Sequence, residues 1–150
     1  TPEPRLDQTS TFEAINEIQV FCEYYPSSVY KDEAQRMMFE LQDKLVEKEY
    51  LSARLYYNLG NYMGNNYRSC VITAQNALQD FPYAKRREDL SYLVFLAKYK
   101  MASESVVEKR EERYRDVVDE YYAFKNEFPE SKYLKDVDKM FNEANKHIKD

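Results

Sequence analysis

The sequence predicts an all-α fold, an α-α superhelix of tetratricopeptide-like helical hairpins with about seven helices. Glycine occurs only at positions 60 and 64, and proline only at 2, 4, 26, 82 and 129. Long spans are therefore free of the residues that break helices. Apolar side chains recur within these spans at the three- to four-residue spacing of an amphipathic helix. One corner sequence also recurs three times, which is typical of stacked repeats.

Each copy of the corner contains an apolar residue, an aromatic residue four positions later, and then proline. The copies span residues 21–30, 77–84 (the most degenerate) and 124–133. Proline has no N–H and restricts the residue before it, so a helix should end at each corner. Ser28 and Ser131 follow their prolines by two residues, and we expect their side-chain oxygens to cap the next helix.

The first helices are predicted from these signals in order. Residues 1–9 are expected to be an extended lead-in, and a Ser-x-x-Glu capping box at Ser10 starts a helix that ends at Pro26. The next helix begins at Ser28 and runs to about residue 48. A third helix covers about 49–62, but no breaker separates it from the second. A kink is therefore as compatible with the sequence as a loop.

The remaining helices follow the second and third corners. They are predicted at about 67–80, at about 85–103, from a second capping box at Ser105 to Pro129, and from Ser131 onward. The prolines are further apart than the ~34 residues of a strict tetratricopeptide unit, so the hairpins should be degenerate. We expect one solenoid domain over 1–150. Its first helix completes a hairpin, so N-terminal repeats are expected to be missing and its outer face to be covered by something N-terminal.

The composition argues against several classes of function. The net charge is −5 with both signs mixed, which does not suggest a nucleic-acid partner. Cys22 and Cys70 form no Cys-x-x-Cys pair, and two buried apolar side chains are favoured over a disulfide. His147 is the only histidine and is interpreted as a solvated helix end. No metal-ligand spacing, phosphate loop or catalytic constellation is visible, so we expect neither an enzyme nor a cofactor.

Basic side chains suggest one candidate docking surface. They precede or occupy two of the predicted helices, namely Lys85 and Arg86, together with Lys109, Arg110, Arg113 and Arg115. A solvated face is the simpler interpretation, and a docking surface for a partner protein is the alternative.

A second candidate is a groove at Tyr57, Asn58 and Asn61. The first helix of a hairpin usually lines the concave side of such a stack, and some tetratricopeptide grooves hold a peptide carboxylate with Asn and Lys. Tyr57 occupies the lysine position here. The clamp is therefore incomplete, and an ordinary polar groove is the alternative.

An ordered set of short motifs resembles one known family, BamD, the outer-membrane protein assembly lipoprotein of Gram-negative bacteria, in a form like that of the Bacteroidetes. The resemblance extends from Leu6 to about Ala144 and would correspond to the C-terminal part of the family's repeats. Besides the first and last corners, it rests on Leu6-Asp7-Gln8-Thr9, Lys44-Leu45, Leu55-Tyr56-Tyr57, Asn65-Asn66-Tyr67, Ala102-x-x-Ser105 and Lys109-x-x-x-Arg113-Tyr114.

The resemblance implies a scaffold without enzyme activity on the periplasmic face of the outer membrane. The family is held there by a lipidated N-terminal cysteine, which this chain lacks, so membrane contact is expected only through that anchor. The C-terminal repeats of the family dock on the periplasmic domains of the barrel insertase, and the N-terminal repeats receive unfolded outer-membrane proteins. From the residues alone, the alternative is a soluble adaptor that binds extended or C-terminal peptides in its concave groove.

Overall fold

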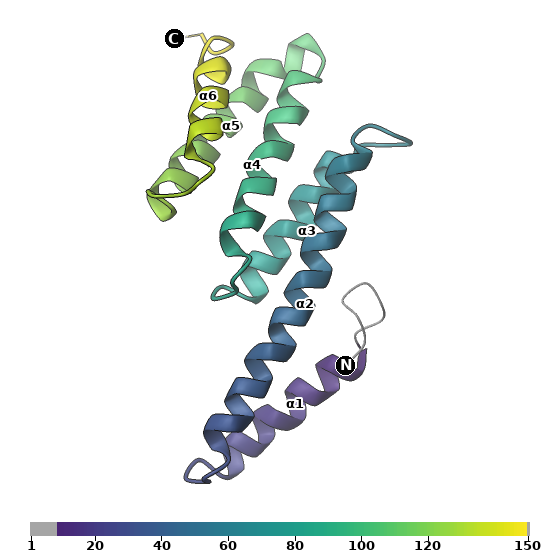
Figure 1. Ribbon diagram of the computed structural model, residues 1–150. Helices are drawn as coiled ribbons and strands as arrows, with labels where there is room; N and C mark the ends of the chain where they lie inside the picture. The colour runs from purple at the N-terminus through teal and green to yellow at the C-terminus, as the bar shows by residue number, and fades with distance from the viewer. Residues whose placement is uncertain (1–8, 150) are drawn as a thin grey trace.

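The computed structural model describes residues 9–149, which form six helices and no strand (Figure 1). The predicted all-helical fold of stacked hairpins is confirmed. The helices in chain order are α1 (Thr9–Tyr24), α2 (Lys31–Leu59), α3 (Asn66–Asp80), α4 (Arg87–Ser103), α5 (Val107–Glu127) and α6 (Leu134–Asn145). The expected lead-in falls outside the described residues except for Thr9, which belongs to α1.

The second and third predicted helices are one helix, so the count is six and not about seven. Helix α2 continues for 29 residues without interruption. No glycine or proline lies between Lys31 and Leu59. The buried Leu45 and Val46 belong to an apolar stripe that keeps its helical spacing across the predicted boundary near residue 48. Figure 1 shows the reason for its length: α1 packs beside the N-terminal half of α2, and α3 packs beside the C-terminal half.

The prediction that Ser10 and Ser105 each cap the start of a helix is wrong. Helix α1 already includes Thr9, so Ser10 lies inside its first turn. The Ser105 hydroxyl donates to the Ala102 carbonyl at 2.7 Å, and Val106 separates this serine from α5. Ser105 therefore stabilises the end of α4 and does not cap the start of α5.

The three corners have the same backbone structure. In each, the N–H of the aromatic residue before proline donates to the carbonyl four residues earlier, at 2.8–2.9 Å. The fourth residue after proline then directly precedes the next helix, with φ between −91° and −82° and ψ near 0°. Ser28 and Ser131 accept from the N–H of that residue at 3.2 and 3.0 Å. They therefore stabilise the turn itself, and not the first turn of the helix as predicted.

The helices form two layers. Helices α2, α4 and α6 contact one another in sequence, whereas α1, α3 and α5 each contact only helices of the first layer. We call α2, α4 and α6 the inner layer, and α1, α3 and α5 the outer layer. Two apolar cores join the layers, one around Val46, Cys70, Ala74 and Leu90, the other around Phe95, Tyr114, Val117 and Val137.

The close crossing of α3 with its neighbours gives a test of this packing. Ala74 is fully buried in α3, and Gln75 beside it is exposed. We expect Ala74→Leu to lower the free energy of unfolding by about 1–3 kcal/mol, because the added side chain has no space. Gln75→Leu should change it by less than about 0.5 kcal/mol. Urea titration followed by circular dichroism measures both, and equal effects would contradict the crossing.

Candidate docking surfaces

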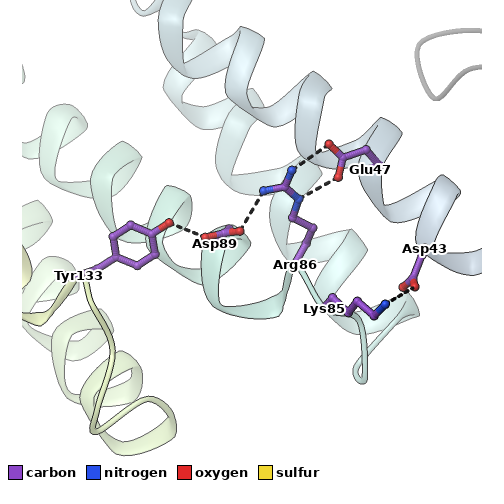
Figure 2. Close-up of polar contacts among 6 residues, drawn as sticks. All are labelled: Asp43, Glu47, Lys85, Arg86, Asp89 and Tyr133. Atoms are coloured by element: carbon purple, nitrogen blue, oxygen red, sulfur yellow. Dashed lines mark hydrogen bonds and ion pairs between the residues drawn. The ribbon is translucent and has the colours of Figure 1, made fainter.

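Arg86 joins α2 to α4 at the second corner (Figure 2). Its Nε and Nη2 donate to the two carboxylate oxygens of Glu47 on α2 at 2.8 and 2.9 Å. Its Nη1 donates to Asp89 on α4 at 3.0 Å, and its guanidinium lies 4.1 Å from the centre of the Tyr50 ring. The hydrogen bonds to Glu47 are the main reason that the pKa of Arg86 is raised, so this cation stays charged.

Tyr133 makes the equivalent connection at the third corner. Its ring stacks on Tyr92 of α4 with the ring centres 3.9 Å apart, and its hydroxyl donates to the Asp89 carboxylate (Figure 2). Arg86 and Tyr133 are each the fourth residue after a corner proline. Each side chain therefore contacts an acidic residue and the tyrosine that follows that acidic residue by three positions. The contacted pair lies on the preceding inner-layer helix, which is α2 for Arg86 and α4 for Tyr133. We call this contact the corner interlock.

The corner interlock was missed from the sequence, although its parts are visible there. The two acidic-x-x-Tyr pairs are Glu47 with Tyr50 and Asp89 with Tyr92. They lie about 40 residues before the side chains that bind them, and nothing local marks the pairing. The repeat of the corner is the signal that could have found it, because equivalent positions in stacked hairpins have equivalent neighbours.

The six predicted docking cations do not form one patch. Lys85 and Arg86 precede α4, whereas the other four lie on the first turns of α5, beside the C-terminal end of α4. Most of the length of α4 separates the two groups, roughly 20 Å at about 1.5 Å per residue. Lys85 is exposed and lies 3.9 Å from Asp43, so only the Arg86 side chain of this pair is held firmly.

Two of the α5 cations donate to carbonyls at the junction of α4 and α5, Arg113 to the last turns of α4 and Arg110 to the loop after it. Arg110 Nη2 donates to the Ser105 carbonyl at 3.2 Å, and Arg113 Nη1 donates to the Met101 carbonyl at 3.4 Å. The C-terminal end of a helix carries a partial negative charge that favours such cations. Arg110 and Arg113 therefore have a structural role as well as the predicted docking role.

Lys109 and Arg115 are the two predicted docking cations of α5 that are exposed. The Lys109 side chain makes no ion pair or hydrogen bond within the described part of the chain, and Arg115 donates to Glu111 at 3.0 Å. Around them lies a shallow hollow of about 470 Å³ that is also lined by acidic residues, Glu112, Asp116 and Asp119. This surface has mixed charge, which suits a specific protein contact better than binding to any polyanion.

The predicted groove residues lie near the end of α2. The Tyr57 ring packs edge-on against Tyr67, and Asn58 is exposed. Asn61 Nδ2 donates to the Glu104 carboxylate at 3.1 Å. Burial and this carboxylate both raise the pKa of Tyr67. A carboxylate therefore already occupies the position near Asn61, and it would repel the carboxylate of a peptide C-terminus.

A hollow of about 380 Å³ lies between α4 and α6 on the inner layer. It is lined by Tyr92, Tyr99, Asp136, Lys139, Met140 and Glu143. Tyrosine and methionine are common at protein interfaces because they combine apolar area with adaptable shape. The hollow therefore adds an inner-layer surface for polypeptide contact that sequence reasoning did not find.

The groups with nucleophilic or metal-binding chemistry are dispersed. Cys22 and Cys70 are free thiols, and burial raises the pKa of Cys70 to about 12. The His147 ring stacks on Tyr114 with the ring centres 4.3 Å apart. Within residues 9–149, no group of His, Cys, Asp and Glu could hold a metal ion. Over the same residues, no helix combines the length and the apolar character that a membrane crossing requires.

Comparison with known proteins gives one family match. The family model YfiO, described as outer membrane lipoprotein, matches residues 2–64. This segment includes α1 and α2 and is less than half of the chain. No curated protein matches. The resemblance to the BamD-type lipoproteins is thereby confirmed for the N-terminal two helices.

The Asp89 carboxylate gives a test of the corner interlock that depends on pH. Burial would raise the pKa of Asp89, but the hydrogen bonds from Tyr133 and Arg86 outweigh burial and lower it. Its stabilising effect is therefore complete above the unfolded-state pKa of about 3.9 and is lost as the pH falls through the folded-state pKa. We expect Asp89→Asn to cost about 1–2 kcal/mol at pH 7 and less at pH 3.

Urea unfolding at both pH values measures this difference. The control is Asp119→Asn on α5, because Asp119 is exposed and makes no ion pair within the described residues. It should change stability little at either pH. An Asp89→Asn effect that is the same at pH 3 and pH 7 would contradict the role of the ionised carboxylate.

Proposed function

We propose that this chain is a non-enzymatic scaffold of the machinery that assembles outer-membrane β-barrel proteins, and that it docks on the periplasmic domains of the barrel insertase. The observation that carries the proposal is the match of residues 2–64 to an outer membrane lipoprotein family. In the full-length protein, a lipid anchor would hold this scaffold on the periplasmic face of the outer membrane. Unfolded outer-membrane proteins are a second class of partner.

The shape of the chain supports a scaffold. Two cores and two corner interlocks hold the helices as one stack, and large parts of both layers remain open to solvent. One shallow hollow lies on α5 and is lined by charged side chains, and another lies between α4 and α6 and is lined by tyrosine, methionine and charged side chains. Such surfaces are suited to contact with other polypeptides.

The C-terminal hairpins are the proposed docking region. They carry the exposed Lys109 and Arg115, the mixed-charge hollow beside them, and the inner-layer hollow between α4 and α6. Charged side chains at the edge of an interface mainly determine partner choice and association rate. The alternative, a groove that captures peptide C-termini at Tyr57, Asn58 and Asn61, is less favoured because Glu104 binds Asn61.

The docking region can be tested with charge reversals. We expect the double variant Lys109→Glu and Arg115→Glu to bind the purified insertase periplasmic domains at least about tenfold more weakly, since both side chains are exposed on α5. Biolayer interferometry measures the affinity. Arg68→Glu, an exposed arginine on α3 and outside the docking region, is the control and should bind as the wild type does.

The reversal of Arg110 and Arg113 serves as a second variant. Because both donate to carbonyls at the α4–α5 junction, the unfolding free energy of this variant is measured alongside binding. Wild-type affinity in both double variants would remove the α5 surface from the proposal. Loss of affinity in the Arg68→Glu control would show that the effect is a general one of charge.

A further inference from the structure

The hollow between α4 and α6 is lined by two pairs of side chains with the same spacing. Tyr92 and Tyr99 lie seven residues apart on α4, and Asp136 and Glu143 lie seven residues apart on α6. Seven residues make about two helical turns, or roughly 10 Å, and bring a side chain back to nearly the same face. Each helix therefore presents its pair to the hollow with the same separation.

The two pairs lie level with one another, because α4 and α6 run in the same direction (Figure 1). Tyr133, which directly precedes α6, stacks on Tyr92 near the start of α4. Burial raises the pKa of Tyr92, and the charge of Asp136 adds to this shift. Burial and the charge of Glu143 act on the pKa of Tyr99 in the same way. The hollow therefore has a tyrosine with a carboxylate at each end.

Both carboxylates are available to a ligand. The Asp136 side chain makes no hydrogen bond or ion pair within the part of the chain that the structure describes. Glu143 lies 3.2 Å from Lys146, whose side chain is 73% exposed, and 3.6 Å from His147. Exposed ion pairs contribute little stability, so a ligand cation can replace Lys146 at small cost. Met140 supplies apolar area between the two carboxylates.

An arginine bound by a tyrosine and a carboxylate already occurs in this chain. At the second corner, the Arg86 guanidinium donates to the Glu47 carboxylate and lies 4.1 Å from the centre of the Tyr50 ring. In the α4–α6 hollow, the tyrosine and the carboxylate come from two helices instead of one, and no arginine lines the hollow. The same chemistry is therefore present there twice without its cation.

We propose that the α4–α6 hollow binds a helix of another protein that carries two arginines or lysines seven residues apart, with an apolar residue between them. One cation pairs with Asp136 and the other with Glu143, while the apolar side chain packs on Met140. A helix matches the site because its side chains repeat at the same spacing as those of α4 and α6. The site depends on the proposed scaffold function only in that its ligand is a polypeptide, and this ligand need not be the insertase.

Charge and spacing argue against other occupants. Lys139 lies between the two carboxylates along α6, so the hollow is not a uniformly acidic patch, and cations at another spacing gain less from it. Anionic lipid head groups and nucleic acids are repelled by the carboxylates. A second copy of the chain does not fit, because none of the six described helices carries two cations seven residues apart.

The probe for this site is an alanine-rich helical peptide with two arginines seven residues apart and a leucine four residues after the first arginine. We expect it to bind the 150-residue chain, as measured by fluorescence anisotropy at low salt. The double variant Asp136→Asn and Glu143→Gln should bind it at least about tenfold more weakly. The control is Glu112→Gln with Asp119→Asn, two exposed carboxylates seven residues apart on α5, and it should leave binding unchanged.

A second peptide tests the spacing. Exchanging the leucine with the second arginine keeps the composition but places the arginines four residues apart, and this peptide should bind the wild-type chain at least about fivefold more weakly. Absence of binding by the first peptide, equal binding of the two peptides, or equal binding by the wild type and the Asp136→Asn, Glu143→Gln variant would overturn the proposal. An equal loss in the α5 control would also overturn it, because net charge would then explain the effect.

Two further measurements examine the other occupants. Binding to phosphatidylethanolamine–phosphatidylglycerol vesicles that the Asp136→Asn, Glu143→Gln variant abolishes would assign the hollow to lipid instead. Self-association in sedimentation equilibrium that the same variant abolishes would assign it to a second copy. The insertase test fails independently, because it reverses cations on α5 that do not line this hollow and uses the insertase domains as the ligand.

Discussion

The contact on which the inner layer depends is made, at the second and third corners, by the side chain that follows the proline by four residues. Arg86 and Tyr133 each reach back to an acidic residue and a tyrosine on the inner helix two positions earlier. Direct contacts within this layer are sparse compared with those inside each hairpin. The interlocks therefore add specific polar and ring contacts between inner-layer helices to the apolar packing that α3 and α5 provide.

Proline has two effects at each corner. It ends the outer-layer helix, and the turn that it starts places the fourth residue directly before the next inner helix, pointing back along the stack. An arginine and a tyrosine fill this position by different chemistry, an ion pair in one case and ring stacking in the other. Asp89 accepts hydrogen bonds from both, so the two interlocks meet at one carboxylate (Figure 2).

Much of this fold could be predicted from local sequence. Helices, their apolar stripes and the three corners follow from spacing and from proline, which act over a few residues. The continuity of α2 could not be predicted, because the absence of a breaker permits a loop, a kink or an unbroken helix equally. The partner of Arg86 could not be predicted either. Arg86 belongs to a run of cations that suggests a solvated face, yet it contacts Glu47 on the distant helix α2.

The functional inference was likewise predictable in one part and not in another. The motif resemblance is confirmed over the segment that the lipoprotein family matches, residues 2–64. The candidate docking cations were chosen by charge alone, and the structure separates them into two groups at opposite ends of α4. The exposed Lys109 and Arg115 on α5 then mark the contact surface that we propose for this scaffold.

The most direct test of this account is a double-mutant cycle on Glu47 and Arg86. The free energy of unfolding is measured by urea titration for the wild type, Glu47→Ala, Arg86→Ala and the double variant. If the interlock joins α2 to α4, the two substitutions are coupled by about 1 kcal/mol or more. Effects that add to within about 0.3 kcal/mol would show that the hairpins are held without it, and would contradict the account.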